Sequence, residues 1–276
     1  MMADFAFPAA LFLCMIVLHI LRRRESKRRG MPLLNPRFKL GAASSFGTRA
    51  VQQDYFGVKE LQGALLVVLA DGFGHNGELA AKFTVDTFRN LFVNKAILDK
   101  PQYFFRRAAN ASNKQILNTL EERQGESSAA AVMINNSQMF YMLIGNCRVA
   151  VFRNGDLIPV SEGQTIDVLA RHRYEEGRIS KQQTLALLDK HRRYNVLGQD
   201  SFEEIELFSK PLNLKPKDLI VVMSEGVFNT LRWKELEEIL EQGDPPQILA
   251  ETVIERVDKS AMVDKANATV LICRQL

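Results

Sequence analysis

Apolar and polar positions alternate along the chain with two different periods, which predict its strands and helices. Short apolar runs rich in β-branched and aromatic residues predict strands, and these lie at 37–44, 54–58, 63–70, 129–134, 138–145, 148–153, 203–209, 218–224 and 268–274. Longer stretches with an apolar residue every three or four positions predict helices at 78–93, 101–123, 233–242 and 246–258, and the polar segment 163–192 is expected to be helical in two pieces.

The order of these elements favours antiparallel sheets. The turns at 135–138 and 154–155 contain Asn, Ser and Gly, residue types that suit the tight turns of hairpins. They predict that residues 129–160 form an antiparallel meander. Adjacent hairpins with helices in pairs, rather than strand–helix–strand alternation, indicate the α+β class.

The N-terminal segment has a different character from the rest of the chain. Residues 5–21 are apolar with no permanently charged side chain, and their length is close to the minimum for a helix that spans a bilayer. Basic residues follow at 22–29, whereas a cleaved signal peptide has its positive charge before the apolar run. A buried core helix would rarely border so basic a cluster. An anchor that only lies on the membrane surface, helped by anionic lipids, is a weaker form of the same interpretation.

We therefore divide the chain into a membrane-anchor segment at 1–21, a basic linker at 22–37 and a folded domain at 38–276. By the positive-inside rule, the domain is expected to face the cytoplasm. The net charge of +4 is unevenly placed, because residues 1–40 contain eight Lys or Arg and only two acidic residues. The remaining chain is slightly acidic, so we expect no nucleic-acid partner. The three cysteines are too scattered for a metal site or a disulfide framework, in agreement with a reducing compartment.

Three carboxylates lie at the ends of predicted strands. Asp54 begins one strand, while Asp71 and Glu225 each follow a buried strand and precede a glycine. Hard cations such as Mg²⁺ and Mn²⁺ prefer oxygen ligands, including carboxylates and the carbonyls exposed at glycine turns. Each Asp-Gly or Glu-Gly pair alone is an ordinary turn. Together they predict a metal site at one edge of a sheet.

Five motifs, in this order, resemble those of the protein phosphatase 2C family, the metal-dependent PPM-type Ser/Thr phosphatases, and especially its bacterial single-domain members. They are Arg49-Ala50-Val51-Gln52-Gln53-Asp54, Asp71-Gly72, Gly145-Asn146-Cys147-Arg148, Ser224-Glu225-Gly226 and Ala266-Asn267-Ala268-Thr269. The family patterns are R-x-x-x-E-D, D-G, G-D-S-R, S/C-D-G and D-N-x-T/S. The resemblance covers about residues 38–276. It implies two packed antiparallel β-sheets flanked by helices on both faces, with a two-metal centre at one end of the sandwich.

The resemblance assigns roles residue by residue. Asp71 matches the aspartate that bridges the two metals, and Gly72 matches the carbonyl ligand beside it. Asp54 matches the second acid of the E-D pair, and Glu225 matches the aspartate of S-D-G with one methylene more. Arg49 matches the arginine that holds the substrate phosphate, a task for which its planar fork is suited. The alternative for Arg49 is an ordinary solvated residue.

Other positions depart from the family pattern. Gln53 stands in place of a glutamate, Asn146 in place of the aspartate of G-D-S-R, and Asn229 in place of an acid that often follows S-D-G. Ala266 replaces the aspartate of D-N, which is normally a direct metal ligand. Asp264 lies roughly 7 Å from Ala266 along an extended chain, too far to replace that ligand unless the loop is remodelled.

These departures predict an impaired metal centre. Three carboxylates do not neutralise two divalent ions, and Mg²⁺ tolerates little error in its octahedron. We expect at most one Mn²⁺ or Mg²⁺ ion to bind well, and the pattern is also compatible with none. We assign no catalytic residue. His75 lies three positions after Gly72, whereas the leaving-group histidine of some family members follows the glycine directly, so a surface role is expected for it.

Two functions remain from these observations. One is a pseudophosphatase, which keeps the fold and binds a protein or phosphoprotein partner near the membrane. The alternative is an active Mn²⁺- or Mg²⁺-dependent phosphoserine/phosphothreonine phosphatase that tolerates Glu225.

Overall fold

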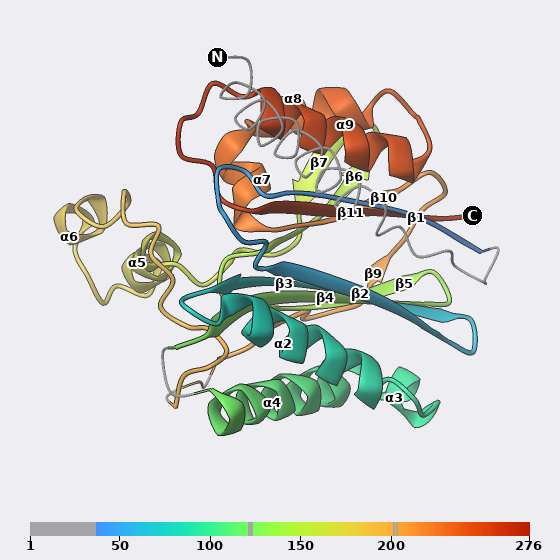
Figure 1. Ribbon diagram of the computed structural model, residues 1–276, viewed down its shortest axis with the longest axis horizontal. Helices are drawn as coiled ribbons and strands as arrows, with labels where there is room; N and C mark the ends of the chain where they lie inside the picture. The colour runs from blue at the N-terminus through green and yellow to red at the C-terminus, as the bar shows by residue number, and fades with distance from the viewer. Residues whose placement is uncertain (1–36, 121–123, 201, 203) are drawn as a thin grey trace, which may run out of the picture.

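The computed structural model describes residues 37–120, 124–200, 202 and 204–276. In this part of the chain, two antiparallel β-sheets pack face to face (Figure 1). The first sheet contains, in spatial order, β1 (Phe38–Ser45), β11 (Ala268–Gln275), β10 (Leu219–Met223), β6 (Arg148–Arg153) and β7 (Asp156–Pro159). The second contains β2 (Asp54–Leu61), β3 (Ala64–Phe73), β4 (Glu126–Asn135), β5 (Gln138–Ile144) and β8 (Glu206–Leu207), with β9 (Leu212–Asn213) also paired to β5.

Helices cover both outer faces of this sandwich (Figure 1). Against the second sheet lie α2 (Gly77–Leu91) and α4 (Pro101–Thr119), joined by the short α3 (Ala96–Asp99). Against the first sheet lie α7 (Glu225–Thr230), α8 (Trp233–Leu240) and α9 (Pro246–Lys259). The segment between β7 and β8 contains α5 (Ile166–Glu175) and α6 (Lys181–Leu185), which project to one side in Figure 1. The α+β class with two packed antiparallel sheets is confirmed.

The burial of β3 explains why its sequence is a continuous apolar run. Successive side chains of a strand point to opposite faces of the sheet. Leu65, Val67 and Leu69 belong to the core between the two sheets, whereas Leu66 and Val68 belong to the core beneath α2 and α4. Because both faces of β3 are covered, both sets of positions must be apolar.

The predicted meander over residues 129–160 is wrong in one respect. The hairpins β4–β5 and β6–β7 form as expected, and Asn136, Ser137 and Asn154 have the positive φ values that such turns need. However, β5 belongs to one sheet and β6 to the other. The chain crosses between the sheets at Gly145, whose φ of 76° favours glycine.

Two further expectations concern a short strand and the N-terminal segment. Of the strand expected at 203–209, the described part, residues 204–209, forms only the two residues of β8. The expected membrane anchor at 1–21 and most of the linker at 22–37 lie outside the described residues. Among the described residues, the structure has no helix with the length and apolar character needed to cross a membrane.

Candidate functional site

Asp54 and Asp71 face each other across neighbouring strands. They are register partners in the β2–β3 pair, and both side chains are buried. Asp71 was expected just after a strand, but β3 continues through it to Phe73. The two acids that the resemblance assigned to metal binding are therefore held side by side by the sheet itself.

Ser224 fixes the carboxylate of Asp54. Its hydroxyl donates to Asp54 Oδ2 at 2.8 Å and accepts from the backbone N–H of Thr269 at 2.9 Å. The other oxygen, Oδ1, is buried without a hydrogen-bond partner among the described residues. Burial raises the pKa of Asp54 to about 6, because it disfavours the charged form.

Glu225 brings the third carboxylate to the same place. It is the first residue of α7, a short helix where the sequence suggested only a turn, and its backbone N–H donates to Asp71 Oδ2 at 3.4 Å. On its own side chain, Oε1 accepts from Asn229 Nδ2 at 2.9 Å. Burial, and after it the charge of Asp54, raise the pKa of Asp71 well above its ordinary value.

A cation that the sequence did not reveal lies among these acids. The guanidinium of Arg193 forms a hydrogen-bonded ion pair with Glu225 Oε2, and its Nη2 lies 3.9 Å from Asp71 Oδ2. The same group stacks over the ring of Phe73, 4.3 Å from the ring centroid. No motif marks Arg193. It directly follows the polar segment 163–192, for which the sequence predicted only helices.

Arg49 pairs with an acid outside this cluster. It is exposed, and its two terminal nitrogens pair with the two oxygens of Asp264, at 3.1 and 3.2 Å. In this structure both oxygens of Asp264 are thus engaged by Arg49. The proposed phosphate role of Arg49 stays a prediction. His75, as expected, is exposed.

The other motif positions differ in the contacts that they make. Gln53 donates through its side-chain amide to the carbonyl of Gly74 at 2.8 Å. Asn146 is buried, with a side-chain oxygen that has no partner among the described residues. Asn267, beside Ala266, accepts from the backbone of Gln53 at 2.9 Å and so ties the β11 loop to the start of β2. Gly72 is required sterically, because a Cβ there would lie 2.0 Å from the carbonyl oxygen of Gly77.

Solved bacterial structures share this architecture. The serine/threonine phosphatase of S. agalactiae matches with a TM-score of 0.74 at 20% identity, over 87% of this chain and 100% of that one. PstP/Ppp of Mycobacterium tuberculosis matches with a TM-score of 0.71 at 20% identity, over 86% of this chain and 98% of that one. This chain has the protein phosphatase 2C-like fold. The catalytic domain of PstP in complex with two manganese ions also matches, with a TM-score of 0.65 at 20% identity, over 86% of this chain and 97% of that one. The sequence matches no family model and no curated protein.

A two-metal centre does not fit the side chains of this phosphatase-like domain as they lie. Among the described residues there is no group of three or more His, Cys, Asp or Glu side chains placed to hold a metal ion. Asp54 Oδ2 accepts a hydrogen bond from Ser224. The carboxylate of Glu225 is bonded to Asn229 and Arg193. The unpartnered Oδ1 of Asp54 is the feature that favours an ion, or a proton, at this site.

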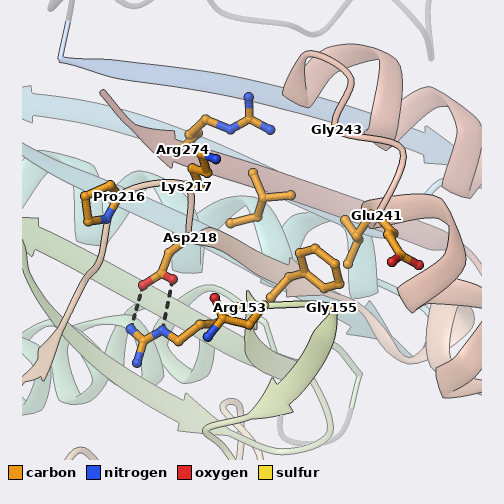
Figure 2. A pocket seen from close by; sticks show the side chains of 12 residues that line it. Arg153, Gly155, Pro216, Lys217, Asp218, Glu241, Gly243 and Arg274 are labelled. Carbon is orange, nitrogen blue, oxygen red and sulfur yellow. Dashed lines mark hydrogen bonds and ion pairs between the residues drawn. The ribbon is translucent and has the colours of Figure 1, made fainter.

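A separate hollow lies at the other end of the first sheet, where β10 begins and β11 ends (Figure 2). Its volume is about 460 Å³. Along one wall, Arg153 forms a two-pronged ion pair with Asp218, at 2.9 and 2.6 Å. Asp218 also accepts from the backbone N–H of Lys215 at 2.7 Å. These contacts anchor the turn before β10, so we interpret the pair as structural.

Proposed function

We propose that this protein is a pseudophosphatase: a phosphatase-like domain that binds a protein or phosphoprotein partner and no longer performs two-metal hydrolysis. The observation that supports this most is the pairing of Arg193 with Glu225, because a cation of the protein occupies a carboxylate that the resemblance assigned to a metal. The absence of a side-chain carboxylate at Ala266 supports it further.

The proposal includes a location. The apolar segment 5–21 and the basic cluster after it would tether the domain to the cytoplasmic face of a membrane. A partner would then be a membrane-associated protein, or a protein recruited to the membrane by phosphorylation.

An active Mn²⁺- or Mg²⁺-dependent Ser/Thr phosphatase is the second candidate. It is favoured by the convergence of Asp54, Asp71 and Glu225, and by the fold shared with a phosphatase solved with two manganese ions. In that case the metals would supply the activated water and the charge that stabilises the leaving oxygen.

The deciding experiment compares hydrolysis with binding. The full chain is incubated with a phosphoserine peptide and Mn²⁺, with a bacterial phosphatase of the same fold as the positive control. We expect no hydrolysis above background, together with measurable binding of a phosphoprotein or protein partner. Turnover that requires Mn²⁺ would replace the proposal with the active phosphatase.

A further inference from the structure

We propose that the guanidinium of Arg193 is the resident cation of the carboxylate cluster and takes the place of divalent ions, so that the domain folds and stays folded without metal. This inference rests on the proposed function, since it concerns the same site. It adds the reason why that site can lack metal without collapsing.

Buried acids need a counter-charge. Asp54 and Asp71 lie opposite each other in the sheet with side chains almost fully buried, and Glu225 joins them from α7. Burying a carboxylate that has no compensating partner is strongly unfavourable. In the phosphatases of this fold, metal ions would provide that compensation. Here the described residues place one arginine at the cluster.

The contacts of Arg193 suit it to this role. It pairs directly with Glu225, approaches Asp71 and stacks on Phe73, and its side chain is only 25% exposed. A guanidinium remains charged at every pH relevant to proteins and donates hydrogen bonds from a planar fork. Stacking on an aromatic ring adds a further attraction in a partly desolvated site. A divalent ion would therefore have to displace a well-held group of the same sign.

Backbone contacts of residues 192–194 with residues 164–166 hold Arg193 in place at the cluster. Residue 193 is bridged to Thr165, and the carbonyl of its neighbour Arg192 accepts from Ile166 N at 2.9 Å. On the other side, the N–H of Tyr194 donates to the carbonyl of Gln164 at 3.1 Å. Arg192 itself is exposed. Neighbouring arginines with opposite environments thus provide a matched pair for experiment.

The test measures thermal unfolding of the full chain and of the variants Arg193→Gln and Arg192→Gln, each in a chelator and in excess Mn²⁺. For the wild type and Arg192→Gln, we expect the same Tm in both solutions. For Arg193→Gln, we expect a lower Tm in chelator that rises when Mn²⁺ is added, because the ion replaces the lost charge. Calorimetry should show Mn²⁺ binding to Arg193→Gln at least about tenfold more tightly than to the wild type, since one like charge near the ion has been removed.

Two results would overturn the inference. One is a wild type that Mn²⁺ stabilises as much as it stabilises Arg193→Gln. The other is an Arg193→Gln variant whose Tm in chelator equals that of Arg192→Gln. If Arg193→Gln does not fold, Arg193→Lys keeps the positive charge without the fork. Its Tm should be lower than that of the wild type but insensitive to Mn²⁺, and a Tm that rises with Mn²⁺ would again overturn the inference.

The proposed function fails separately. Wild-type hydrolysis of a phosphopeptide would overturn the pseudophosphatase proposal, whatever the Tm values are. Conversely, a wild type that binds Mn²⁺ tightly without hydrolysing the peptide would overturn the role of Arg193 and leave the proposed function standing.

Discussion

Arg193 and Glu225 form an ion pair although they come from different parts of the fold, one from the segment between β7 and β8 and the other from the start of α7. The pair joins the side segment to the edge of the sandwich. It also means that a cation of the protein lies at this site, in addition to the altered ligand positions.

Restoring the missing ligands should therefore not be sufficient. In the double variant, Glu225→Asp shortens that side chain to the length of the family aspartate, and Ala266→Asp restores the missing carboxylate. With Arg193 retained, we expect a small gain in Mn²⁺ affinity. Adding Arg193→Gln should bring metal affinity and phosphopeptide hydrolysis up together, because two-metal catalysis requires both ions. Calorimetry and a phosphate-release assay on the same samples would check this, and full activity in the double variant alone would contradict it.

Ser224 is expected to contribute to stability through Asp54. Replacing it with alanine removes the donor to Asp54 Oδ2 and leaves the N–H of Thr269 without its acceptor. We expect a loss of about 1–3 kcal/mol in the free energy of unfolding, the range for an unsatisfied buried group. Urea denaturation would measure it. The control is Thr252→Ala, whose hydroxyl bonds to the backbone of its own helix in a more exposed position. An equal effect of both variants would remove the special role of Ser224.

Anion binding at Arg49 should depend on Asp264. Asp264 pairs with both terminal nitrogens of Arg49, so its negative charge opposes a phosphate that approaches the same guanidinium. Asp264→Asn should therefore strengthen phosphopeptide binding. Arg49→Ala should weaken it by about 1.5 kcal/mol, the lower end for hydrogen bonds to a charged group, since the side chain is half exposed. Fluorescence anisotropy with a labelled peptide would show both effects. Unchanged affinity in both variants would leave Arg49 as a surface residue.

At the opposite end of the first sheet, Asp218 should contribute more to stability than a residue of an exposed ion pair does. Its side chain is 3% exposed, and that of Arg153 is 18% exposed. Asp218→Ala removes the hydrogen bonds from Arg153 and from the backbone of Lys215, so we expect a loss of about 1.5–3 kcal/mol in unfolding free energy. Lys234→Ala is the control, because its side chain is exposed and its loss from the pair with Glu237 should cost less than about 1 kcal/mol. Comparable losses in chemical denaturation would contradict the structural role of Asp218.

Membrane attachment is a prediction from the apolar residues 5–21 and the basic residues 22–29 that follow them. The full chain should sediment with membranes, and removal of residues 1–30 should release it. Extraction with carbonate would distinguish a spanning anchor from a surface one, since only the spanning form should resist it. A full chain recovered without membranes at low salt would contradict the anchor.

The apolar runs predicted the antiparallel α+β fold because such patterns are local, whereas the two-sheet sandwich and the roles of the three acids were implied by the family resemblance of their motifs. The structure places Asp54 and Asp71 opposite each other in the β2–β3 pair, with Glu225 beside them at the start of α7. Arg193 could not be predicted, since its position depends on a bridge to Thr165 within a polar segment that has no motif. The crossing at Gly145 was missed for a related reason. A tight glycine turn has the same local chemistry whether the next strand joins the same sheet or the facing one.

The stoichiometry of Mn²⁺ binding to the unmodified full chain, measured by isothermal titration calorimetry, decides whether a two-metal centre can form. We expect binding never to reach two ions per chain at any concentration that leaves the protein soluble. Saturable binding of two Mn²⁺ ions per chain would contradict it, because the Arg193–Glu225 pair and a complete two-metal centre exclude each other.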